Sequence, residues 1–180
     1  MVLDLGCGNG HGAAEHNGRA YIGLDIDAAV LAASPWRERV PLVCGSAEQL
    51  PFRDGAFSAI RSGVAIPYMD IPKVAAELHR VAAPGATVYL SGHGLKFTLH
   101  ELVQTREFVP LLYRLYVLAN GLYFHVTGRM FRFPFKRNRI ESFQTPRSLI
   151  RVMRRAGFAE VEIVPRSPLP VSAKKPPSPI

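Results

Sequence analysis

Cysteine is scarce in this sequence. Cys7 and Cys44 are the only two among 180 residues, and neither belongs to a CxxC pair or to a pattern of zinc ligands. This spacing argues against a disulfide framework and a structural zinc site, so we expect reduced thiols and no bound metal. No basic and then apolar segment precedes the first hydrophobic run, which argues against secretion. We therefore predict a cytoplasmic protein.

A long uninterrupted apolar segment is missing as well. The most apolar run, residues 108–126, is interrupted by Pro110, Arg114, Asn120 and His125. A helix that crosses a bilayer needs about 20 predominantly apolar residues, and charged or polar side chains within it are unfavourable. We expect that this segment does not span a membrane, although it could lie against the surface of one.

Acidic residues are few in the second half of the chain. From Leu95 onward there are 15 Lys and Arg but 5 Asp and Glu, whereas the residues up to Gly94 contain 7 and 9. The net charge of +8 therefore divides into −2 and +10. This division indicates a ligand-binding scaffold followed by a cationic surface, suited to an acidic substrate, an anionic lipid surface or nucleic acid.

Short apolar runs alternate with stretches suited to helices in the first half. Such alternation is typical of an α/β protein, in which a parallel sheet carries helices on its faces. Asn17-Gly18 and Asp54-Gly55 mark turns, and Pro84-Gly85 is expected to end the helix before the fifth strand. The expected strands are VLDLG, AYIGLD, VPLVCG, FSAIRS and ATVYLS, and the expected helices include DAAVLAAS and IPKVAAELHRVAA.

The second half begins with helical periodicity and ends in a proline-rich tail. Apolar residues recur at helical spacing over 95–125, which predicts one or two amphipathic helices broken near Pro110. TPRSLIRVMRRAGF then predicts a helix capped by Thr145, and AEVEIV predicts a half-buried strand. Six prolines fall within the last sixteen residues, so we expect a single domain over 1–164 and a disordered or extended tail over 165–180.

A glycine-rich stretch, Gly6-Cys7-Gly8-Asn9-Gly10, lies where the first strand should give way to a helix. Glycines at such a turn let the backbone approach a ligand while free N–H groups point at its negative end. The segment Gly8–Ala13 also fits GxGxxA, and Asp25 follows at the spacing of a ribose-binding acid in a dinucleotide fold. A nicotinamide-dependent oxidoreductase is therefore one open alternative.

Five motifs that follow one another along the chain indicate which cofactor the glycine loop serves. They are LDLGCGNG, GLDID, CGSAEQLPF, FSAIRS and HRVAAPGATVYLS. They resemble the successive motifs of class I S-adenosylmethionine-dependent methyltransferases, notably the small-molecule branch that includes quinone C-methyltransferases. The resemblance covers residues 1–92 and returns over 145–164. It implies a Rossmann-like, doubly wound, mostly parallel sheet. Residues 95–140 lie outside the resemblance, and we expect them to form a helical and basic insertion over the active site.

Two elements of that family have no obvious counterpart here. The family normally has a helix before the first strand and an antiparallel seventh strand after the sixth. The sequence begins directly with VLDLG and ends in PRSPLPVSAKKPPSPI. We therefore expect this fold to lack both elements, which would leave an open edge on the sheet.

The resemblance also implies how the cofactor is held. The loop from Asp4 to Gly10 would hold the methionine portion, and Asp4 would order this loop or receive the ammonium group. Asp25 would accept both ribose hydroxyls, as suits a carboxylate with two acceptor oxygens, and Ile26 would pack on the adenine. The implied cofactor-binding residues are Asp4, Gly6, Cys7, Gly8, Gly10, Asp25, Ile26, Ser46, Ala47 and Glu48.

Two positions depart from the family pattern. Ser46 and Ser58 stand where the family commonly has an acid. The first acid would contact the adenine amino group, so this contact is weaker here or is taken over by Glu48. These departures support a second alternative, a non-catalytic binding or scaffold protein that keeps the fold. Asp27 fits a helix N-cap better than a ligand, and Cys7 fits a packing role better than a nucleophile.

The acceptor is less readable than the cofactor. If the acceptor loses a proton, His93 after the fifth strand is the nearest candidate base, and the alternative is a capping or loop histidine without a function. The apolar stripe of the insertion could line a pocket for a small hydrophobic acceptor or simply pack on the sheet. Its candidate wall residues are Phe97, Phe108, Tyr113, Tyr116, Tyr123 and Phe124.

Residues 129–139 interleave cations with aromatic rings. This mixture is consistent with a solvated basic loop, with peripheral contact to an anionic membrane, or with single-stranded nucleic acid. We rank nucleic acid last. The sequence as a whole predicts methyl transfer from S-adenosylmethionine to a small, hydrophobic acceptor.

Overall fold

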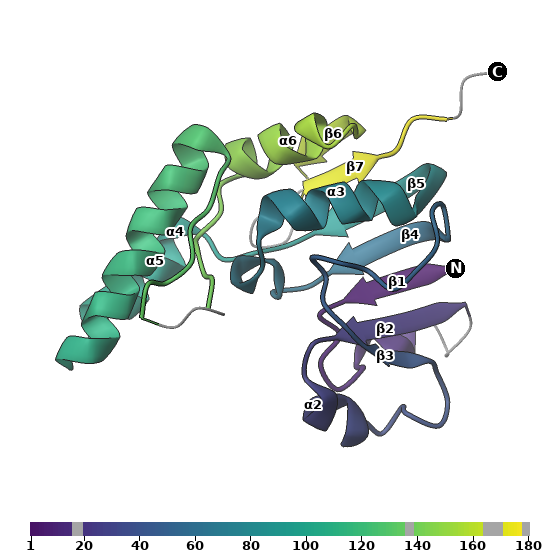
Figure 1. The fold of residues 1–180 in the computed structure, drawn as a ribbon, viewed down its shortest axis with the longest axis horizontal. Coiled ribbons are helices and arrows are strands. Elements are labelled where there is room, and N and C mark those ends of the chain that lie inside the picture. The colour runs from purple at the N-terminus through teal and green to yellow at the C-terminus, as the bar shows by residue number, and fades with distance from the viewer. Residues whose placement is uncertain (16–19, 136–138, 164–170, 178–180) are drawn as a thin grey trace.

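The computed structural model describes residues 1–15, 20–135, 139–163 and 171–177. Their centre is a sheet in the order β3-β2-β1-β4-β5-β7-β6, in which the first five strands are parallel and β7 runs antiparallel to β5 and β6 (Figure 1). The expected Rossmann-like, mostly parallel sheet is confirmed. The strands are β1 (Val2–Leu5), β2 (Tyr21–Asp25), β3 (Leu42–Cys44), β4 (Phe57–Ser62), β5 (Ala82–Leu90), β6 (Ala159–Ile163) and β7 (Val171–Lys174).

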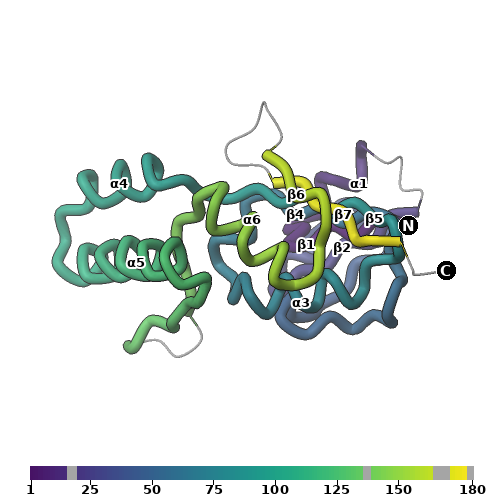
Figure 2. The backbone as a smooth tube through the Cα atoms, turned by 90° about the horizontal axis from the view of Figure 1, so that it is seen from above, coloured from purple at the N-terminus to yellow at the C-terminus, as the bar shows by residue number. Residues whose placement is uncertain are grey.

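Helices flank the sheet on both sides, and Figure 2 shows α1 and α3 on opposite sides of the strands. Helix α3 places an apolar residue on the sheet at each turn, and its Val74 and Leu78 join Leu3 and Leu5 of β1 in the main core. The helices are α1 (Gly12–Glu15), α2 (Ala28–Ala32), α3 (Ile71–Val81), α4 (Leu95–Gln104), α5 (Phe108–Thr127) and α6 (Pro146–Arg155), with a 3-10 turn at Ile66–Tyr68.

Helices α4 and α5 form a hairpin beyond the carboxyl ends of the strands (Figure 1). The predicted break near Pro110 falls instead at 105–107. Pro110 lies in the first turn of α5, where a missing N–H costs nothing because that amide has no intrahelical partner. Within the described part of the chain, no helix has the length and apolar content needed to cross a membrane.

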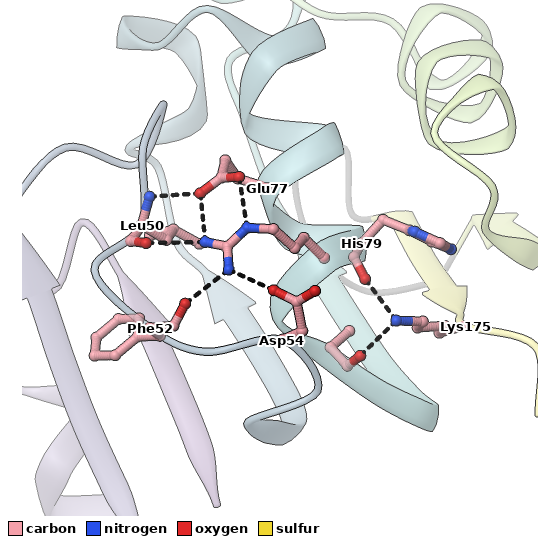
Figure 3. Close-up of polar contacts among 8 residues, drawn as sticks. Leu50, Phe52, Asp54, Glu77, His79 and Lys175 are labelled. Atoms are coloured by element: carbon pink, nitrogen blue, oxygen red, sulfur yellow. Dashed lines mark hydrogen bonds and ion pairs between the residues drawn. The ribbon is translucent and has the colours of Figure 1, made fainter. Parts of the chain in front are cut away.

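The expectation that the last antiparallel strand is missing is wrong. Residues Val171 and Ala173 of β7 are buried in the core between β5 and β6, and Lys174 is exposed, so the strand alternates as expected for period two. Lys175 then donates from Nζ to the carbonyl oxygens of His79 and Ala82, each at 2.8 Å (Figure 3). The predicted domain end at 164 is therefore wrong too. The rest of the predicted tail, 164–170 and 178–180, lies outside the described residues.

The fifth strand also begins earlier than predicted. Helix α3 ends at Val81 and β5 begins at Ala82, so Pro84-Gly85 lies within the strand and does not end the helix. The two residues are exposed, and the pairing of β4 with β5 shifts register between Phe57 and Ala59. Proline is tolerated in a strand at such an irregularity because no ladder hydrogen bond is needed there.

Arg80 of α3 ties the loop after β3 to the helix (Figure 3). Its guanidinium donates to the carbonyl oxygens of Leu50 and Phe52 and to the carboxylates of Asp54 and Glu77 at 2.7–2.9 Å. Arg80→Ala should lower the free energy of unfolding by about 1–3 kcal/mol, because partly buried carbonyl groups lose their donor. Urea denaturation measures this loss.

The pH dependence of unfolding tests the same network. The hydrogen bond from Arg80 lowers the pKa of Glu77 below its ordinary value of 4.5. A depressed carboxyl pKa contributes stability above the unfolded pKa, and this contribution is lost as the pH falls through the folded pKa. The fall in the free energy of unfolding on acidification should be smaller in Arg80→Ala than in Arg53→Ala, a control that removes an exposed arginine. Equal urea midpoints and an equal pH dependence of stability in the two variants would contradict the stabilising role of Arg80.

Candidate functional site

A cavity of about 490 Å³ lies at the carboxyl ends of the parallel strands, beside the point where the strand order reverses between β1 and β4. Open α/β sheets bind ligands in this crevice. The volume falls within the range of about 300–1,000 Å³ typical of small-molecule sites. The cavity is lined by Gly6, Leu24, Asp25, Ile26, Gly45, Ser46, Ala47, Glu48, Ala65, Tyr68, Met69, Arg132 and Ile140.

Six of the predicted cofactor residues line this cavity: Gly6, Asp25, Ile26, Ser46, Ala47 and Glu48. They follow β1, β2 and β3, whose parallel carboxyl ends meet at one edge of the sheet. Ile26 is 76% exposed and presents an open apolar surface. Their grouping in one cavity agrees with a shared ligand, and the role of each in cofactor binding remains a prediction.

Gly6 lies where the loop after β1 packs against Ala65 of the loop after β4. Its φ is +69°, and a Cβ at this position would lie 2.2 Å from the Cβ of Ala65. Both the backbone conformation and the contact therefore require glycine. Gly8 also has positive φ, at +54°, but a Cβ there would meet nothing within 4 Å.

The amides of the glycine loop are already hydrogen-bonded within the protein. Four of them donate as follows: Gly6 and Cys7 to the Leu24 carbonyl, Gly8 to the Asp25 carboxylate and Gly10 to the Cys7 carbonyl. The expectation that free N–H groups of this loop face a ligand is wrong for these four. Three of these bonds hold the tight turn to β2, and the fourth closes the loop on itself. We therefore expect the loop to accommodate a ligand through its missing side chains and its shape.

Asp25 ends β2 and has both carboxylate oxygens fixed. Oδ2 accepts from the Gly8 amide at 2.8 Å and Oδ1 from the Asp27 amide at 3.0 Å. A carboxylate offers about four lone-pair directions, so each oxygen can still accept from a hydroxyl. Asp27 itself caps α2 by accepting from the Ala29 and Val30 amides, and its predicted capping role is confirmed.

Glu48 links the cavity to the loop after α5. Its carboxylate accepts from Arg132 at 2.9 Å and from the Asp70 amide at 3.2 Å, and Lys73 lies 3.6 Å away. The Ser46 hydroxyl accepts from the Glu48 amide at 3.1 Å. Glu48 is thus engaged with two cations and an amide, and both Ser46 and Glu48 line the cavity.

Four other predicted residues do not line the cavity. Asp4 is buried beneath α1, accepts from the Tyr21 hydroxyl at 2.8 Å and lies 3.5 Å from the Arg61 guanidinium. Cys7 packs against Gly23, and burial raises the pKa of its thiol to about 12, so it is a poor nucleophile. The set outside the cavity lining is Asp4, Cys7, Gly8 and Gly10.

His93 follows β5 and lies one side chain away from the cavity. Its half-buried ring lies edge-on to Tyr68, at 5.8 Å between centroids, and against Phe97 at 4.3 Å. Tyr68 itself lines the cavity. Burial lowers the pKa of the His93 imidazole, although the charges of Glu141 and Glu101 oppose this shift. A neutral imidazole beside the cavity can accept a proton.

The predicted aromatic walls are mostly elsewhere. Tyr113 and Tyr116 pack with Phe133 in a separate cluster, Phe124 belongs to the main core and Phe108 is 71% exposed. Phe124 holds α5 to the main core, whereas Tyr113 and Tyr116 pack within the insertion itself. Of the six candidates, Phe97 alone is seen to contact His93 among the described ring contacts.

Sequence reasoning missed the contribution of the loop after β4 and of the loop after α5. Ala65, Tyr68 and Met69 follow β4, and Arg132 and Ile140 follow α5. The first group could have been found, because β4 ends beside β1 at the edge where the cavity opens. No local signal in the sequence places Arg132 next to Glu48, 84 positions earlier.

Comparison with known proteins agrees with this geometry. The family model described as "Methyltransferase domain" matches residues 3–90. Malonyl-[acyl-carrier protein] O-methyltransferase of Halorhodospira halophila is 35% identical over 111 residues, which cover 56% of this chain and 37% of the relative. Demethylmenaquinone methyltransferase of Symbiobacterium thermophilum is 27% identical over 178 residues, which cover 89% of this chain and 69% of the relative.

A solved structure shares the fold over almost the whole chain. The crystal structure of a SAM-dependent methyltransferase from Methanosarcina mazei superposes with a TM-score of 0.62 at 20% identity, covering 98% of this chain and 92% of that one. Its match extends through β6 and β7, beyond the residues of the family model. Residues 3–90 thus match a methyltransferase domain, both relatives are methyltransferases, and the solved structure shows that the chain has the fold of a SAM-dependent methyltransferase.

Proposed function

We propose that this protein transfers a methyl group from S-adenosylmethionine to a small lipophilic acceptor of the quinone type. The share of this chain that each kind of relative matches supports this acceptor class. The matches to demethylmenaquinone methyltransferases cover 89–91% of the chain and so include the α4–α5 insertion. The matches to malonyl-carrier-protein methyltransferases cover 49–56% of the chain, which is about the length of the proposed cofactor-binding half.

The observation that carries the proposal is the cavity between Gly6, Asp25 and Ser46. The carboxylate of Asp25 would hold the ribose diol, the exposed face of Ile26 would cover the adenine, and the bare backbone at Gly6 would let the amino-acid end approach. When bound, S-adenosylmethionine supplies an electrophilic methyl group on a sulfonium. The residues of the chain then position the acceptor and keep water out, which are the main requirements of an in-line displacement.

The nicotinamide alternative is not supported by the sheet. The dinucleotide fold has strand order 3-2-1-4-5-6, whereas here the antiparallel β7 lies between β5 and β6. The non-catalytic alternative makes a distinct prediction, because a scaffold would bind cofactor without turnover or would not bind it at all.

Incubation with cofactor labelled in the methyl group tests the proposal. Label should pass to a demethylated quinone in detergent, and the malonyl thioester of a carrier protein should stay unlabelled. Calorimetric titration with S-adenosylhomocysteine provides the binding control. Binding without label transfer to either acceptor would favour the scaffold, and transfer to the thioester alone would overturn the quinone assignment.

His93 is proposed to accept the proton that leaves the acceptor. Because burial lowers the pKa of its imidazole below 6.5, kcat should rise as the pH increases through that lowered pKa and then level off. His93→Asn should lower kcat and remove this rise while leaving the affinity for S-adenosylhomocysteine unchanged. The matched control is His100→Asn, an exposed histidine of α4. An unchanged pH profile in His93→Asn would exclude the role.

Contact of 129–139 with an anionic membrane also stays a proposal. Phe131 and Phe135 of this segment are 40% and 79% exposed, as such a contact needs. Two of its cations are directed into the protein, however: Arg132 binds Glu48, and Arg139 lies over the Tyr113 ring at 4.0 Å. Residues 136–138 lie outside the described part of the chain. The segment alone is therefore a small surface for such a contact.

A further inference from the structure

We propose that the outer apolar face of the α4–α5 hairpin docks the protein on an anionic lipid surface. This outer apolar face consists of Leu95, Leu99 and Val103 of α4 and Phe108, Leu112, Leu115, Ala119, Leu122 and Val126 of α5. The proposal rests on the proposed function in one respect, since a lipophilic acceptor resides in a bilayer.

The α5 row runs the full length of its helix. Its members are separated by 4, 3, 4, 3 and 4 residues, so they lie on one side of the helix. They point away from the body, because the opposite side carries the buried residues Tyr113, Val117, Asn120 and Phe124. Apart from Ala119, the large members are 39–71% exposed.

The α4 row lies beside it. Leu95, Leu99 and Val103 are four residues apart and are 38%, 42% and 82% exposed. Phe97 lies on the opposite flank of α4, where it contacts His93, so the row faces away from the candidate site. Figure 2 shows the two helices side by side and apart from the sheet. Two adjacent rows make a broad apolar surface, of the kind that monomeric proteins rarely leave open to water.

The surrounding charges favour lipid over protein. Helix α5 contains no acidic residue. Lys96, Arg106 and Arg129 are exposed at the helix ends, and within the described residues no ion pair is found for them. A second copy docked face to face would bring these cations close to one another. Glu107, between Arg106 and Phe108, is the acidic residue next to them in the sequence. Anionic head groups would neutralise the same cations while the apolar rows enter the acyl boundary.

The cavity lies next to the chain that returns from the hairpin, which relates the outer apolar face to the proposed acceptor site. Arg132 and Ile140, from the chain that returns from α5, line the cavity. A hairpin lying on a bilayer would therefore hold the cavity close to the lipid, and an apolar acceptor could pass to it without crossing water. A helix on the surface, with its polar side against the body, needs no spanning segment.

Co-sedimentation of the purified chain with vesicles tests the docking. The protein should pellet with phosphatidylcholine vesicles that contain phosphatidylglycerol, and less with phosphatidylcholine alone or at high salt. Leu115→Glu and Leu122→Glu should each weaken binding by about tenfold or more, since each replaces an inserted apolar side chain with an anion. The matched control is Ile163→Glu, which changes an equally exposed apolar residue on β6. It should bind as the wild type does.

Two further measurements make the result decisive. If the glutamate variants fail to fold by circular dichroism, Lys96→Glu with Arg106→Glu keeps the apolar rows and should still weaken binding to anionic vesicles. Sedimentation equilibrium tests the rival occupant. A dimer that Leu115→Glu converts to monomer, without vesicle binding by the wild type, would overturn the proposal in favour of a second copy.

Calorimetry separates this proposal from the proposed function. Binding of S-adenosylhomocysteine without vesicle binding would overturn the docking surface alone. Vesicle binding without any cofactor binding would overturn methyl transfer alone. Equal vesicle binding by the wild type and by all hairpin variants would also contradict the assigned face.

Discussion

Gly6→Ala is expected to lower the free energy of unfolding by about 2–5 kcal/mol and to remove measurable cofactor binding. The left-handed backbone at this position costs an alanine about 1–2 kcal/mol. Overpacking against a neighbouring atom adds about 1–3 kcal/mol, and the new Cβ would lie 2.2 Å from the Ala65 Cβ. Because Gly6 and Ala65 both line the cavity, any relief of the contact moves the two loops that shape it.

Gly8→Ala is the matched control for this prediction. Gly8 has positive φ as well, yet a Cβ there would meet nothing within 4 Å. It should therefore show the backbone cost alone, about 1–2 kcal/mol, and keep cofactor binding. Urea unfolding and calorimetric titration of both variants give the comparison. Equal losses in the two would mean that the close approach to Ala65 has no influence on the site.

Asp25→Ala should weaken the binding of S-adenosylhomocysteine by about 1.5–3 kcal/mol, or roughly 10- to 150-fold. This is the range for losing a hydrogen bond to a charged acceptor. The carboxylate also holds the Gly8 amide at 2.8 Å, so the affinity alone does not identify the lost contact. The 2′,3′-dideoxy analogue of S-adenosylhomocysteine resolves this. Wild type should prefer the natural diol, and Asp25→Ala should bind the two ligands almost equally.

The neighbouring carboxylate provides the control. Asp27→Asn keeps a good N-cap for α2 and removes a charge that does not line the cavity. It should bind the diol as tightly as the wild type and retain the preference over the dideoxy analogue. If Asp25→Ala retained that preference undiminished, the ribose site would have to be sought elsewhere in the cavity.

The parts of the site that follow strand ends were predictable. Asp25 ends β2, and Gly6, Ile26 and Ser46 lie within two residues after β1, β2 and β3. Parallel strands bring such positions to one edge regardless of the helices between them. The hydrogen bonds of the loop were not predictable, because a glycine run has the same letters whether its amides face a ligand or the Leu24 carbonyl. Only the path of β2 decides between the two.

The last strand was missed for a different reason. Residues 171–174 form four residues of alternating pattern within a proline-rich stretch, and composition suggested disorder there. Their structure comes from pairing on both sides, with Leu90 of β5 opposite Val171 and Ile163 of β6 opposite the same residue. Such tertiary pairing outweighs weak local propensity. For the apolar stripe of α5 the sequence left two alternatives open, a pocket wall or packing on the sheet, because periodicity reveals such a stripe without telling what covers it.

The strand order has a consequence for how this chain is made. Among the described strands, β6 pairs with β7 alone, and β7 separates it from β5. While the polypeptide is leaving the ribosome, β6 therefore has no neighbour to receive it, and β5 keeps a free border, until residue 174 has emerged. The part of the sheet from β1 to β5 can assemble early, whereas closure of the opposite margin waits until β7 has been synthesised.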